Sequence, residues 1–578
     1  MNRESGTGFS RQSPKKKTSL ERDINYYNKN ILPLIKRRDL LAAESQLRLL
    51  IQAKTKLDLV YSNLAAVLID LKREQEALIY VKEALRYNPK EATSLINLGI
   101  IYAKKNEVNL ARKSFESAIK ITPNRPDLLE NYSGFLAATG ETDYAYALVK
   151  KLLSLAPGSD EGWATLYICL TDMDQHIQAK EAITKSLNLN PKSAKNLSYL
   201  AALVREEGDI EKAEMIQQQA LDLDPKCAIS YSNMALIYQE LDQPQKAYEL
   251  MNQALELDSE SAQSYMNMSI ILFNLNRREE GYKLAEWRRK LRKPYLPYII
   301  PKTIPLLETK DSIHSKLTLI AEQGLGDSIQ FGRYAQWIAK KYNCRIDLHV
   351  QAKLVDIIAH SLDGIKVLSC EGGLDEGSSH YLPLLSCPFV FGEEIDDGQL
   401  HTPYLKVRRM EKNKWEELLM SNRKGKTLIG ITWQGNPEAE KQNQKGRSIK
   451  LETLKPIAEL PGVEFVSLQK GYGSDQLENC SFRQKFSDQQ QIISETMEFM
   501  DMAAIMECCD YIITTDTANA HLAGSIGVKT YLLLKKNPDW RWSPAGERTF
   551  WYPTIQLIRQ QQKNDWPTTV QTLKGFLE

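Results

Sequence analysis

Small residues recur every 34 positions over the first half of the chain, inside segments whose apolar residues follow a helical spacing. The series is Ala43, Ala77, Ala111, Ala145, Ala179, Ala213, Ala247 and Gly281. Prolines keep the same spacing at Pro89, Pro123, Pro157, Pro191 and Pro225. A fixed period of this length is typical of stacked helix–turn–helix units. The pattern therefore predicts about eight units between residues 24 and 290.

One unit shows the pattern most completely and identifies the type of repeat. In the unit that ends at Pro123, bulky, small and aromatic residues stand where two nested helices need them: Leu95, Leu98, Gly99, Tyr102, Ala111, Phe115 and Ala118. This arrangement resembles the tetratricopeptide repeat. Such units bury their apolar stripes only against their neighbours, so we expect an α-solenoid with one concave face that can hold an extended protein or peptide.

Asparagines share one position of the repeat along the expected concave face. They are Asn63, Asn97, Asn131, Asn233 and Asn267, with Thr165 and Tyr199 in the two middle units. Because each side-chain amide is both donor and acceptor, a ladder of them could pair with a peptide backbone. The alternative is structural, since asparagine is common at this position in tetratricopeptide repeats of every function.

The pattern changes on both sides of the repeats. Residues 1–23 are polar and include a run of three lysines, so we expect a disordered tail rather than a binding arm. Residues 291–312 contain four prolines, which indicates a stiff linker. Short apolar runs then alternate with helical stretches in two halves, residues 313–424 and 425–578. This alternation predicts strand–helix units with a parallel sheet in each half.

The first half begins with a predicted strand at residues 316–320, a glycine-rich turn and a helix reaching about residue 341. The two glycines of Gly324-Leu325-Gly326-Asp327 let the backbone approach a ligand closely. Asp327 then either caps the helix or acts as a base aimed into a cleft. Further apolar runs predict strands at residues 346–350, 365–368 and 404–407, before a helix around Trp415.

Three predicted strands of the second half, residues 428–432, 463–468 and 511–515, run into polar residues. Ligands of open parallel sheets bind beyond the carboxyl ends of the strands, so these residues are candidates for a binding site. They are Gln434, Gly435, Asn436, Gln469, Asp516, Thr517 and Ala518. The helix that follows Asp516 is rich in small residues, and its N-terminus would suit a diphosphate, with Arg447 as counter-charge.

These residues belong to motifs that resemble a known group of enzymes. The motifs are Gly-x-Gly-Asp-x-Ile-Gln-Phe-x-Arg-Tyr, Thr-Trp-Gln-Gly-Asn-Pro, Arg-Ser-Ile, Ser-Leu-Gln and Asp-Thr-x-x-x-His-Leu-Ala-Gly. Together with the repeats they resemble bacterial tetratricopeptide-repeat proteins fused to a glycosyltransferase domain. That domain is similar to the ADP-heptose:lipopolysaccharide heptosyltransferases. The resemblance covers nearly the whole chain and implies a GT-B architecture, in which two Rossmann-like domains face across a cleft and the second binds the nucleotide-sugar.

The resemblance also implies roles for particular residues. Members of the group are inverting enzymes whose proposed base is the aspartate of the Gly-x-Gly-Asp turn, which is Asp327 here. Their Asp-Thr-x-x-x-His segment contacts the diphosphate and sugar of the donor. The corresponding residues are Asp516, Thr517, Ala518 and His521. Ala518 replaces a usual glycine, and His521 is either a ligand contact or a packing histidine. Arg447 is the best match for the lysine that these enzymes place near the leaving phosphate.

Aromatic residues near the C-terminus have two readings. Trp540, Trp542, Trp551 and Tyr552 either stack on sugar faces or pack in the core. The vicinal pair Cys508-Cys509 lies in an apolar helical run, and the eight cysteines show no zinc spacing, so we expect reduced structural thiols.

Composition narrows the function further. The net charge of +2 gives no reason to expect nucleic acid as a partner. The N-terminus has no apolar core of a signal peptide, and no run approaches the roughly 18 apolar residues of a membrane span, so we expect a cytoplasmic protein. No Asp-x-Asp follows residue 300, so we expect no metal. The nucleotide-sugar would be a co-substrate, and no cofactor is expected.

The sequence thus favours an inverting, metal-independent glycosyltransferase whose acceptor is a protein held by the repeats. A lipopolysaccharide or capsule glycan remains an alternative acceptor. One competing hypothesis is a non-catalytic interaction scaffold with a degenerate transferase domain. Another is a binding module that senses a nucleotide-sugar without turning it over. These hypotheses differ in whether Asp327, Arg447 and Asp516 meet in one place.

Overall fold

The computed structural model describes residues 19–291, 300, 303–313, 315–372, 377–392, 403–420, 423, 425–437, 440, 446–542 and 544–578. The chain forms two compact units, Met1–Pro225 and Lys226–Glu578, so the division falls inside the repeats. The boundaries expected from sequence at residues 24, 290, 312 and 424 stay predictions. Helix α1 already begins at Ser19, and the rest of the predicted tail lies outside the described residues.

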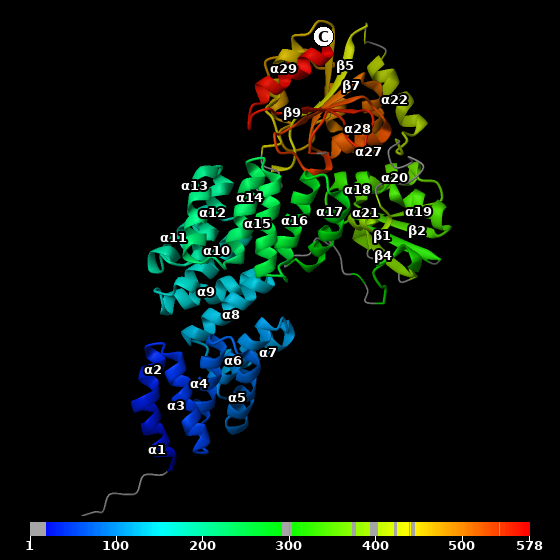
Figure 1. The fold of residues 1–578 in the computed structure, drawn as a ribbon. Coiled ribbons are helices and arrows are strands. Elements are labelled where there is room, and N and C mark those ends of the chain that lie inside the picture. Colours follow the sequence, from blue (N-terminus) through cyan, green and yellow to red (C-terminus); the bar gives the residue numbers. More distant parts are fainter. Residues whose placement is uncertain are drawn as a thin grey trace, which may run out of the picture. The chain divides into compact units, whose positions relative to one another are not determined.

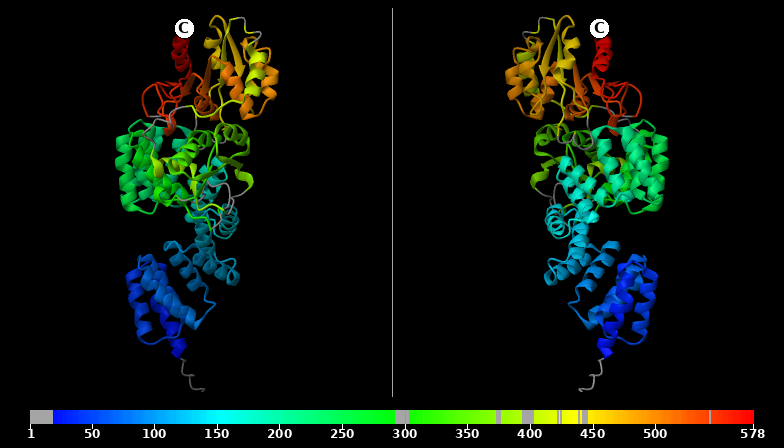
Figure 2. Two further views of the ribbon diagram at one scale, coloured as in Figure 1. Left: turned by 90° about the vertical axis from the view of Figure 1, so that its right-hand side faces the viewer. Right: turned by 90° about the vertical axis from the view of Figure 1, so that its left-hand side faces the viewer.

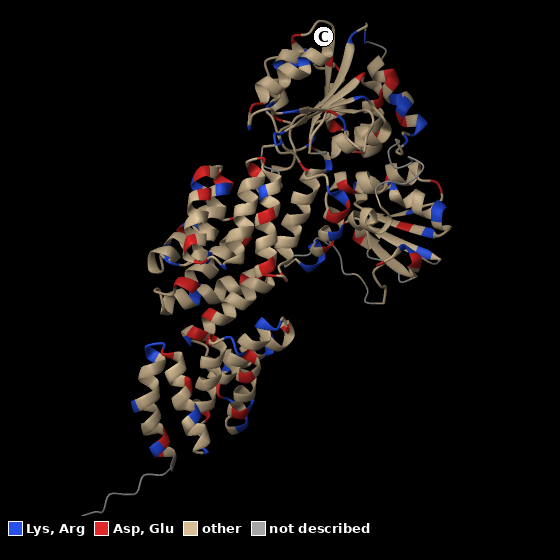
Figure 3. Cartoon of the chain, in the orientation of Figure 1, with Lys and Arg blue, Asp and Glu red and all other residues tan. Residues whose placement is uncertain are grey.

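The N-terminal unit is built from helices that pack in pairs along the chain (Figures 1 and 2). Its helices are α1 Ser19–Tyr26, α2 Leu32–Lys36, α3 Leu40–Gln52, α4 Asp58–Asp70, α5 Glu74–Tyr87, α6 Ala92–Lys104, α7 Val108–Ile121, α8 Pro126–Thr139, α9 Thr142–Leu155, α10 Asp160–Asp172, α11 His176–Leu189, α12 Ala194–Glu207 and α13 Ile210–Leu223. A π-helical turn, Tyr27–Ile31, joins α1 to α2. Both signs of charge are mixed along these helices (Figure 3).

The small residues of the 34-residue series lie where paired helices touch. Ala77, Ala111 and Ala145 are fully buried. Gly99 of α6 faces the Phe115 ring of α7, and a Cβ added to Gly99 would lie 2.7 Å from that ring. The small positions therefore let each helix pair nest closely, which confirms the helix–turn–helix repeats predicted from the period.

The C-terminal unit begins with two more helix pairs and continues with two parallel sheets. The pairs are α14 Ala228–Glu240, α15 Pro244–Leu257, α16 Ala262–Asn274 and α17 Arg278–Ala285. The first sheet has the order β3-β2-β1-β4, with β1 Lys316–Ile320, β2 Arg345–Val350, β3 Lys366–Ser369 and β4 His380–Pro383. The second has the order β6-β5-β7-β8-β9, with β5 Thr427–Thr432, β6 Val463–Ser467, β7 Tyr511–Thr515, β8 Thr530–Leu534 and β9 Ile555–Arg559.

Helices connect the strands of both sheets (Figure 1). They are α18 Leu325–Phe331, α19 Tyr334–Tyr342, α20 Val355–Ser361, α21 Cys387–Phe391, α22 Arg409–Met420, α24 Lys455–Ala458, α25 Gln476–Asn479, α26 Gln490–Glu495, α27 Phe499–Cys508, α28 Ala518–Ile526 and α29 Trp566–Leu577. All strand pairs in the two sheets are parallel, as the alternating pattern predicts.

The strand predicted at residues 404–407 is wrong. The backbone N–H groups of Tyr404 and Leu405 both donate to the carbonyl of Ser525 in α28, at 2.8 and 3.0 Å. The segment is therefore extended without a neighbouring strand, and Leu405 is buried among helices instead. Strands β4, β8 and β9 were not predicted.

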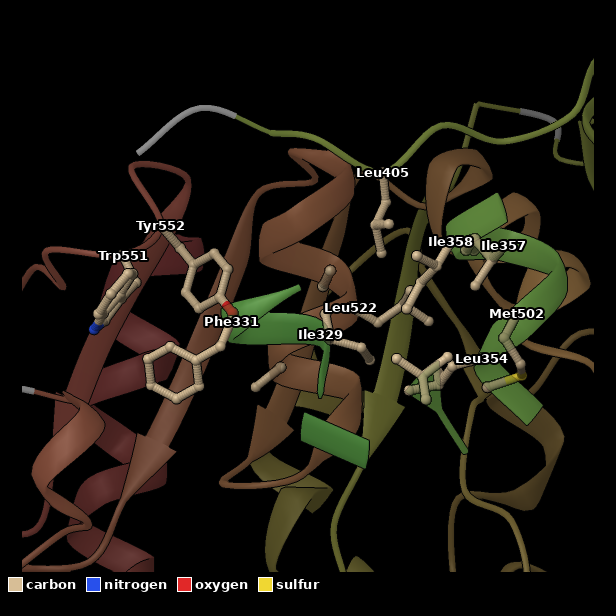
Figure 4. Close-up of a cluster of buried hydrophobic side chains, with 14 of the residues drawn as sticks. Ile329, Phe331, Leu354, Ile357, Ile358, Leu405, Met502, Leu522, Trp551 and Tyr552 are labelled. Atoms are coloured by element: carbon tan, nitrogen blue, oxygen red, sulfur yellow. The ribbon is translucent and has the colours of Figure 1, made fainter. Parts of the chain in front are cut away.

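One continuous apolar core joins the two sheets. Figure 4 shows Ile329 and Phe331 of α18 and residues around α20 gathered with Met502 of α27 and Leu522 of α28. Trp542, Trp551 and Tyr552 are almost fully buried, which favours core packing over sugar stacking for these three. The cysteine pair is also buried, and burial raises the pKa of Cys508 to about 11 and that of Cys509 further.

The last repeat packs directly on both sheets. Phe273 of α16 stacks on Trp540, which follows β8, with ring centroids 4.3 Å apart. Gly281 leaves room for Phe273, because a Cβ there would lie 2.7 Å from the ring. On the first sheet, the buried Arg288 guanidinium donates to both carboxylate oxygens of Glu322, at 3.1 and 2.9 Å. The repeats of this unit are thus part of the same packed body as the sheets.

Candidate functional site

Two helix N-termini, one from each sheet, meet at the candidate site. Helix α18 follows β1 and carries Asp327, and helix α28 follows β7 and begins at Ala518. The helices touch where Gly326 faces His521, because a Cβ added to Gly326 would lie 2.7 Å from Cδ2 of the histidine. The second glycine of the turn therefore permits close contact between the two helices.

Asp327 has partners for both carboxylate oxygens. Oδ2 accepts a hydrogen bond of 2.9 Å from the Gly324 backbone N–H, so Asp327 does cap its own helix. Oδ1 lies 2.6 Å from Nη2 of Arg541, which comes from the second sheet. The side chain is 13% exposed. The cap predicted as one alternative is present, and the same carboxylate also points to the charges of the other sheet.

Arg541 lies on the segment that follows β8, residues Lys535–Trp542, which we call the β8 loop. Its Nη1 lies 2.8 Å from Oδ1 of Asp539, and the same carboxylate accepts from the Arg541 backbone N–H at 3.1 Å. Burial opposes the charge of Arg541, but the Asp327 and Asp539 carboxylates outweigh it and raise the pKa of the guanidinium. For Asp539, burial raises the pKa but Arg541 more than offsets it, so the pKa of Asp539 is lowered.

Arg447 and Asp516 complete the cluster. Nη1 of Arg447 donates to the backbone carbonyl of Asp516 at 3.0 Å. Burial, followed by the charge of Asp539, raises the pKa of Asp516 to about 6. Lys535 feels the charges of Asp516 and Asp539, yet burial lowers its pKa. The three predicted residues Asp327, Arg447 and Asp516 are thus brought together. Arg541 interacts with both Asp327 of the first sheet region and Asp516 of the second.

Several donors in this cluster are buried without a hydrogen bond. Among the described residues they are Nε of Arg447, which lies 3.6 Å from Oε1 of Glu440, Nε of Arg541 and the Thr515 hydroxyl. Buried polar groups in folded proteins nearly always have partners. Two cationic donors and a hydroxyl at the carboxyl ends of β7 and β8 suit an anionic, oxygen-rich ligand such as a diphosphate.

The predicted glutamines make hydrogen bonds that shape the turn after β5, and their contact with a donor stays a prediction. The Gln469 amide accepts from the backbone N–H groups of Trp433 and Gln434 and donates to the carbonyls of Gln434 and Tyr472. Oε1 of Gln434 accepts from Gln476 at 3.0 Å. Gly435 makes room for Arg447, because a Cβ there would lie 2.5 Å from its Nη2. Asn436 begins the next turn, where its carbonyl accepts from Glu440.

The segment after β7 holds the N-terminus of α28 in place. Thr517 precedes the helix, and its hydroxyl lies 3.2 Å from that of Thr514. Asn519 donates to the Thr432 hydroxyl of β5 at 2.9 Å. Nδ1 of His521 lies 2.9 Å from the Tyr552 hydroxyl, and burial lowers the pKa of His521 to about 3. His521 is therefore a neutral packing residue in this structure.

Sequence reasoning missed Arg541, Asp539, Lys535 and Asn519. The available signal was another apolar run, residues 530–534, whose carboxyl end also meets the sheet edge. Trp540 and Trp542 of the following segment stand out as aromatic residues, whereas the charges of Asp539 and Arg541 beside them give no local signal. The missed residues all follow β7 or β8, the strands nearest to the predicted site.

The asparagines of the ladder form hydrogen bonds within the repeats. Side-chain amides of Asn63 and Asn131 donate to the backbone carbonyls of Leu59 and Asp127 in the preceding turn, at 2.7 and 2.8 Å. The buried Asn97 instead donates to the Ser62 carbonyl of the preceding repeat at 2.9 Å.

In the C-terminal unit the buried Asn267 lies 3.5 Å from the Ser232 hydroxyl, and Asn233 has a polar contact of its own. These contacts give the asparagines a structural use, while peptide binding by the ladder stays a prediction.

Two searches across the described part of the chain gave no candidates. No group of three or more His, Cys, Asp or Glu side chains there is arranged to hold a metal ion. No helix within the described ranges has the length and apolar character needed to cross a membrane.

Comparison with known proteins identifies the repeats. The tetratricopeptide repeat family matches residues 60–91, 92–125 and 228–261. The chain contains tetratricopeptide repeats. The type IV pilus assembly protein PilF of Pseudomonas aeruginosa is 31% identical over 135 residues, which are 23% of this chain and 54% of PilF. Human protein O-mannosyl-transferase TMTC1 is 27% identical over 155 residues, 26% of this chain and 18% of TMTC1. The chain thus spans about half of PilF and under a fifth of TMTC1.

Solved structures also match part of the chain. The structure of Pseudomonas aeruginosa PilF has a TM-score of 0.30 at 20% identity and covers 36% of this chain and 94% of its own. A tetratricopeptide repeat protein from Parabacteroides merdae has a TM-score of 0.35 at 16% identity and covers 43% of this chain and 98% of its own.

Proposed function

We propose that the protein is an inverting, metal-independent glycosyltransferase that moves a sugar from a nucleotide-sugar to an acceptor protein held by the repeats. The observation that carries this proposal is the convergence of Asp327 from one parallel sheet with Arg447, Asp516 and Arg541 from the other. A scaffold with a degenerate domain would have no need to keep charged residues of two sheets within one buried cluster.

The two sheets would divide the reaction between them, as in a GT-B pair of Rossmann-like domains. The second sheet would bind the donor beyond the carboxyl ends of β5, β7 and β8. The N-terminus of α28, whose helix dipole favours an anion, would face the diphosphate, and Arg447 would supply positive charge. The buried donors Arg541 Nε and Thr515 Oγ1, which have no hydrogen bond, support an oxygen-rich ligand at this edge.

Asp327 would be the general base. It would take the proton of an acceptor hydroxyl while that oxygen forms a bond to the anomeric carbon from the face opposite the leaving group. The bond between the anomeric carbon and the phosphate oxygen breaks, so its electron pair leaves with the nucleoside diphosphate. The configuration at carbon is inverted. Arg447 and the α28 N-terminus would stabilise the charge that develops on the leaving diphosphate.

The repeats would select the acceptor. Tetratricopeptide repeats support a protein partner, because an array of such units presents an extended concave surface. The name of the human relative, protein O-mannosyl-transferase, describes a sugar transferase acting on protein, which lends limited support to a protein acceptor. The packing of α16 and α17 on the sheets would keep the end of the array beside the charged cluster.

One observation favours the sensing module as a second candidate. Both oxygens of Asp327 already have partners, as they would in a purely structural capping residue. The test is to incubate the protein with a panel of nucleotide-sugars and measure nucleoside diphosphate release, for wild type, Asp327→Ala and Asp516→Ala. Release that both substitutions abolish supports the transferase. Nucleotide binding without any release supports the sensor, and neither binding nor release would leave the repeats as the functional part.

A further inference from the structure

Arg541 forms ion pairs with carboxylates from both sheet regions at the candidate site. Its Nη2 lies 2.6 Å from Asp327 Oδ1, and its Nη1 lies 2.8 Å from Asp539 Oδ1. The side chain is 10% exposed. The third nitrogen, Nε, is buried without a hydrogen bond. One guanidinium thus uses its two terminal nitrogens on carboxylates and keeps one donor unpaired.

The contact with Asp327 conflicts with the role of a general base. A base needs a carboxylate oxygen directed at the acceptor hydroxyl within hydrogen-bond reach. Here Oδ2 accepts from Gly324 and Oδ1 is paired with Arg541. Asp327 can act as a general base only after its ion pair with Arg541 has broken.

A bound diphosphate would change the charge balance that keeps Arg541 on Asp327. Four carboxylates, of Asp327, Glu440, Asp516 and Asp539, lie beside three cations, of Arg447, Lys535 and Arg541. A diphosphate adds negative charge, and a guanidinium binds phosphate oxygens with two parallel hydrogen bonds. The unpaired Nε of Arg541 is available for such a fork.

The β8 loop is held by side chains that contact the last two repeats. Trp540 stacks on Phe273 of α16 at 4.3 Å, and Asn537 donates to the Glu240 carbonyl of α14 at 3.0 Å. Lys563 also pairs with Glu240 at 3.2 Å. The last two repeats therefore fix the loop from one side, and its charged side chains enter the cluster from the other.

We propose that Arg541 is a positioning residue with two alternating partners: it holds Asp327 in the free protein and turns to the diphosphate of a bound nucleotide-sugar. Donor binding then releases the base, so that proton abstraction follows only when a donor is in place. Asp539 keeps Arg541 beside the cluster in both arrangements. This inference rests on the proposed transferase function.

The test compares Arg541→Gln and Arg541→Lys with wild type. The first measurement is calorimetric titration with ADP, GDP and UDP, and with the matching nucleosides, which lack the diphosphate. We expect Arg541→Gln to weaken binding of the preferred diphosphate at least about tenfold and to leave nucleoside binding unchanged, because one diphosphate contact is lost. Arg541→Lys should recover part of the loss, since its single ammonium replaces only part of the fork.

The second measurement is a pair of crystal structures of wild type, one without ligand and one with the preferred nucleoside diphosphate. We expect the Arg541 guanidinium to lie on Asp327 without the ligand, and within hydrogen-bond distance of the diphosphate when it is bound. An Arg541 side chain that stays on Asp327 in the complex would overturn the proposal, and so would unchanged diphosphate affinity in Arg541→Gln.

Arg559→Gln is the matched control. Arg559 is half-buried in the second sheet region, where it donates to the backbone carbonyls of Gly546 and Trp542. The substitution should lower the melting temperature about as much as Arg541→Gln without changing diphosphate affinity. If wild type binds a diphosphate through Arg541 but releases none from any nucleotide-sugar, the transferase function fails while the anion contact of Arg541 stands. If Arg541→Gln and the control weaken binding equally, the role is structural and the proposal fails.

Discussion

The two parallel sheets of the C-terminal unit are built alike but use their charged residues differently. At the end of β1 in the first sheet, Glu322 is neutralised inside the fold by Arg288, and Asp327 reaches the neighbouring sheet. The second sheet concentrates Arg447, Asp516, Asp539 and Arg541 at one edge. The difference indicates that the first sheet offers one reacting group, whereas the second is arranged to hold a charged ligand.

Removing the reacting group of the first sheet should have the largest effect and tests whether the two sheets have different roles. Asp327→Asn should reduce nucleoside diphosphate release by about a thousandfold, because general base catalysis contributes roughly 10²–10⁴. Affinity for the nucleoside diphosphate should change little, since the ligand contacts belong to the second sheet. Release assays and calorimetric titration on the same preparation measure both effects. Asp363→Asn, an exposed site of the first sheet region, is the control and should change neither.

The second prediction concerns the carboxylate that the first sheet neutralises. Arg288→Ala leaves Glu322 buried and unpaired, so the free energy of unfolding should fall by about 3–5 kcal/mol. Replacing both residues by methionine should restore most of the loss, because Glu322 is then no longer a buried charge and Glu286, the other partner of Arg288, keeps its ion pair with Arg289. Denaturant unfolding measures the change. A loss under about 1 kcal/mol would show that Glu322 is not held as a structural ion pair.

The third prediction uses the pKa of Asp516 in the second sheet. Because the pKa is raised from 3.8 to about 6 in the folded protein, the folded state binds more protons than the unfolded state between these values. The free energy of unfolding therefore falls as pH rises through this window. Asp516→Asn should remove that fall and so raise the free energy of unfolding by up to about 3 kcal/mol near neutral pH.

Asp539→Asn is the control of opposite sign. The pKa of Asp539 is lowered in the folded protein, so its carboxylate stabilises the fold above the unfolded pKa and the substitution should destabilise it. Thermal unfolding across acidic and neutral pH separates the two variants. If both substitutions changed the melting temperature by the same amount in the same direction, the opposite pKa shifts assigned to Asp516 and Asp539 would be wrong.

The smallest predicted effect is at the turn after β5. Gly435→Ala places a Cβ about where the Arg447 guanidinium lies, so Arg447 must shift. We expect about tenfold weaker nucleoside diphosphate binding, with little change in stability because the shifted group is a side chain. Gly134→Ala is the control, because its nearest neighbour is 3.9 Å away and the site has room. Calorimetric titration of both variants measures the difference.

Local patterns predicted much of the fold. The small residues of the repeats lie at helix contacts, and the residues after β5, β6 and β7 share one sheet edge, because both arrangements follow from spacing along the chain. The extended segment at Tyr404 failed because its backbone bonds to a helix carbonyl rather than to a strand, which periodicity does not show.

The candidate site was harder to predict than the fold. Asp327, Arg447 and Asp516 were found from turns and strand ends, and the structure brings them together. Arg541 was missed because its importance depends on Asp327, which lies more than 200 residues earlier in the chain, and on burial beside Asp539. Pairings between such distant segments arise only when the two sheets pack, so no local pattern reveals them.

The most direct test of the central claim is a crystal structure of the protein grown with a nucleoside diphosphate that it binds. We predict that the diphosphate lies at the N-terminus of α28, within hydrogen-bond distance of Arg447, and that Asp327 faces it from the first sheet. A diphosphate bound elsewhere, or at this edge with Asp327 turned away from it, would contradict the division of roles between the two sheets.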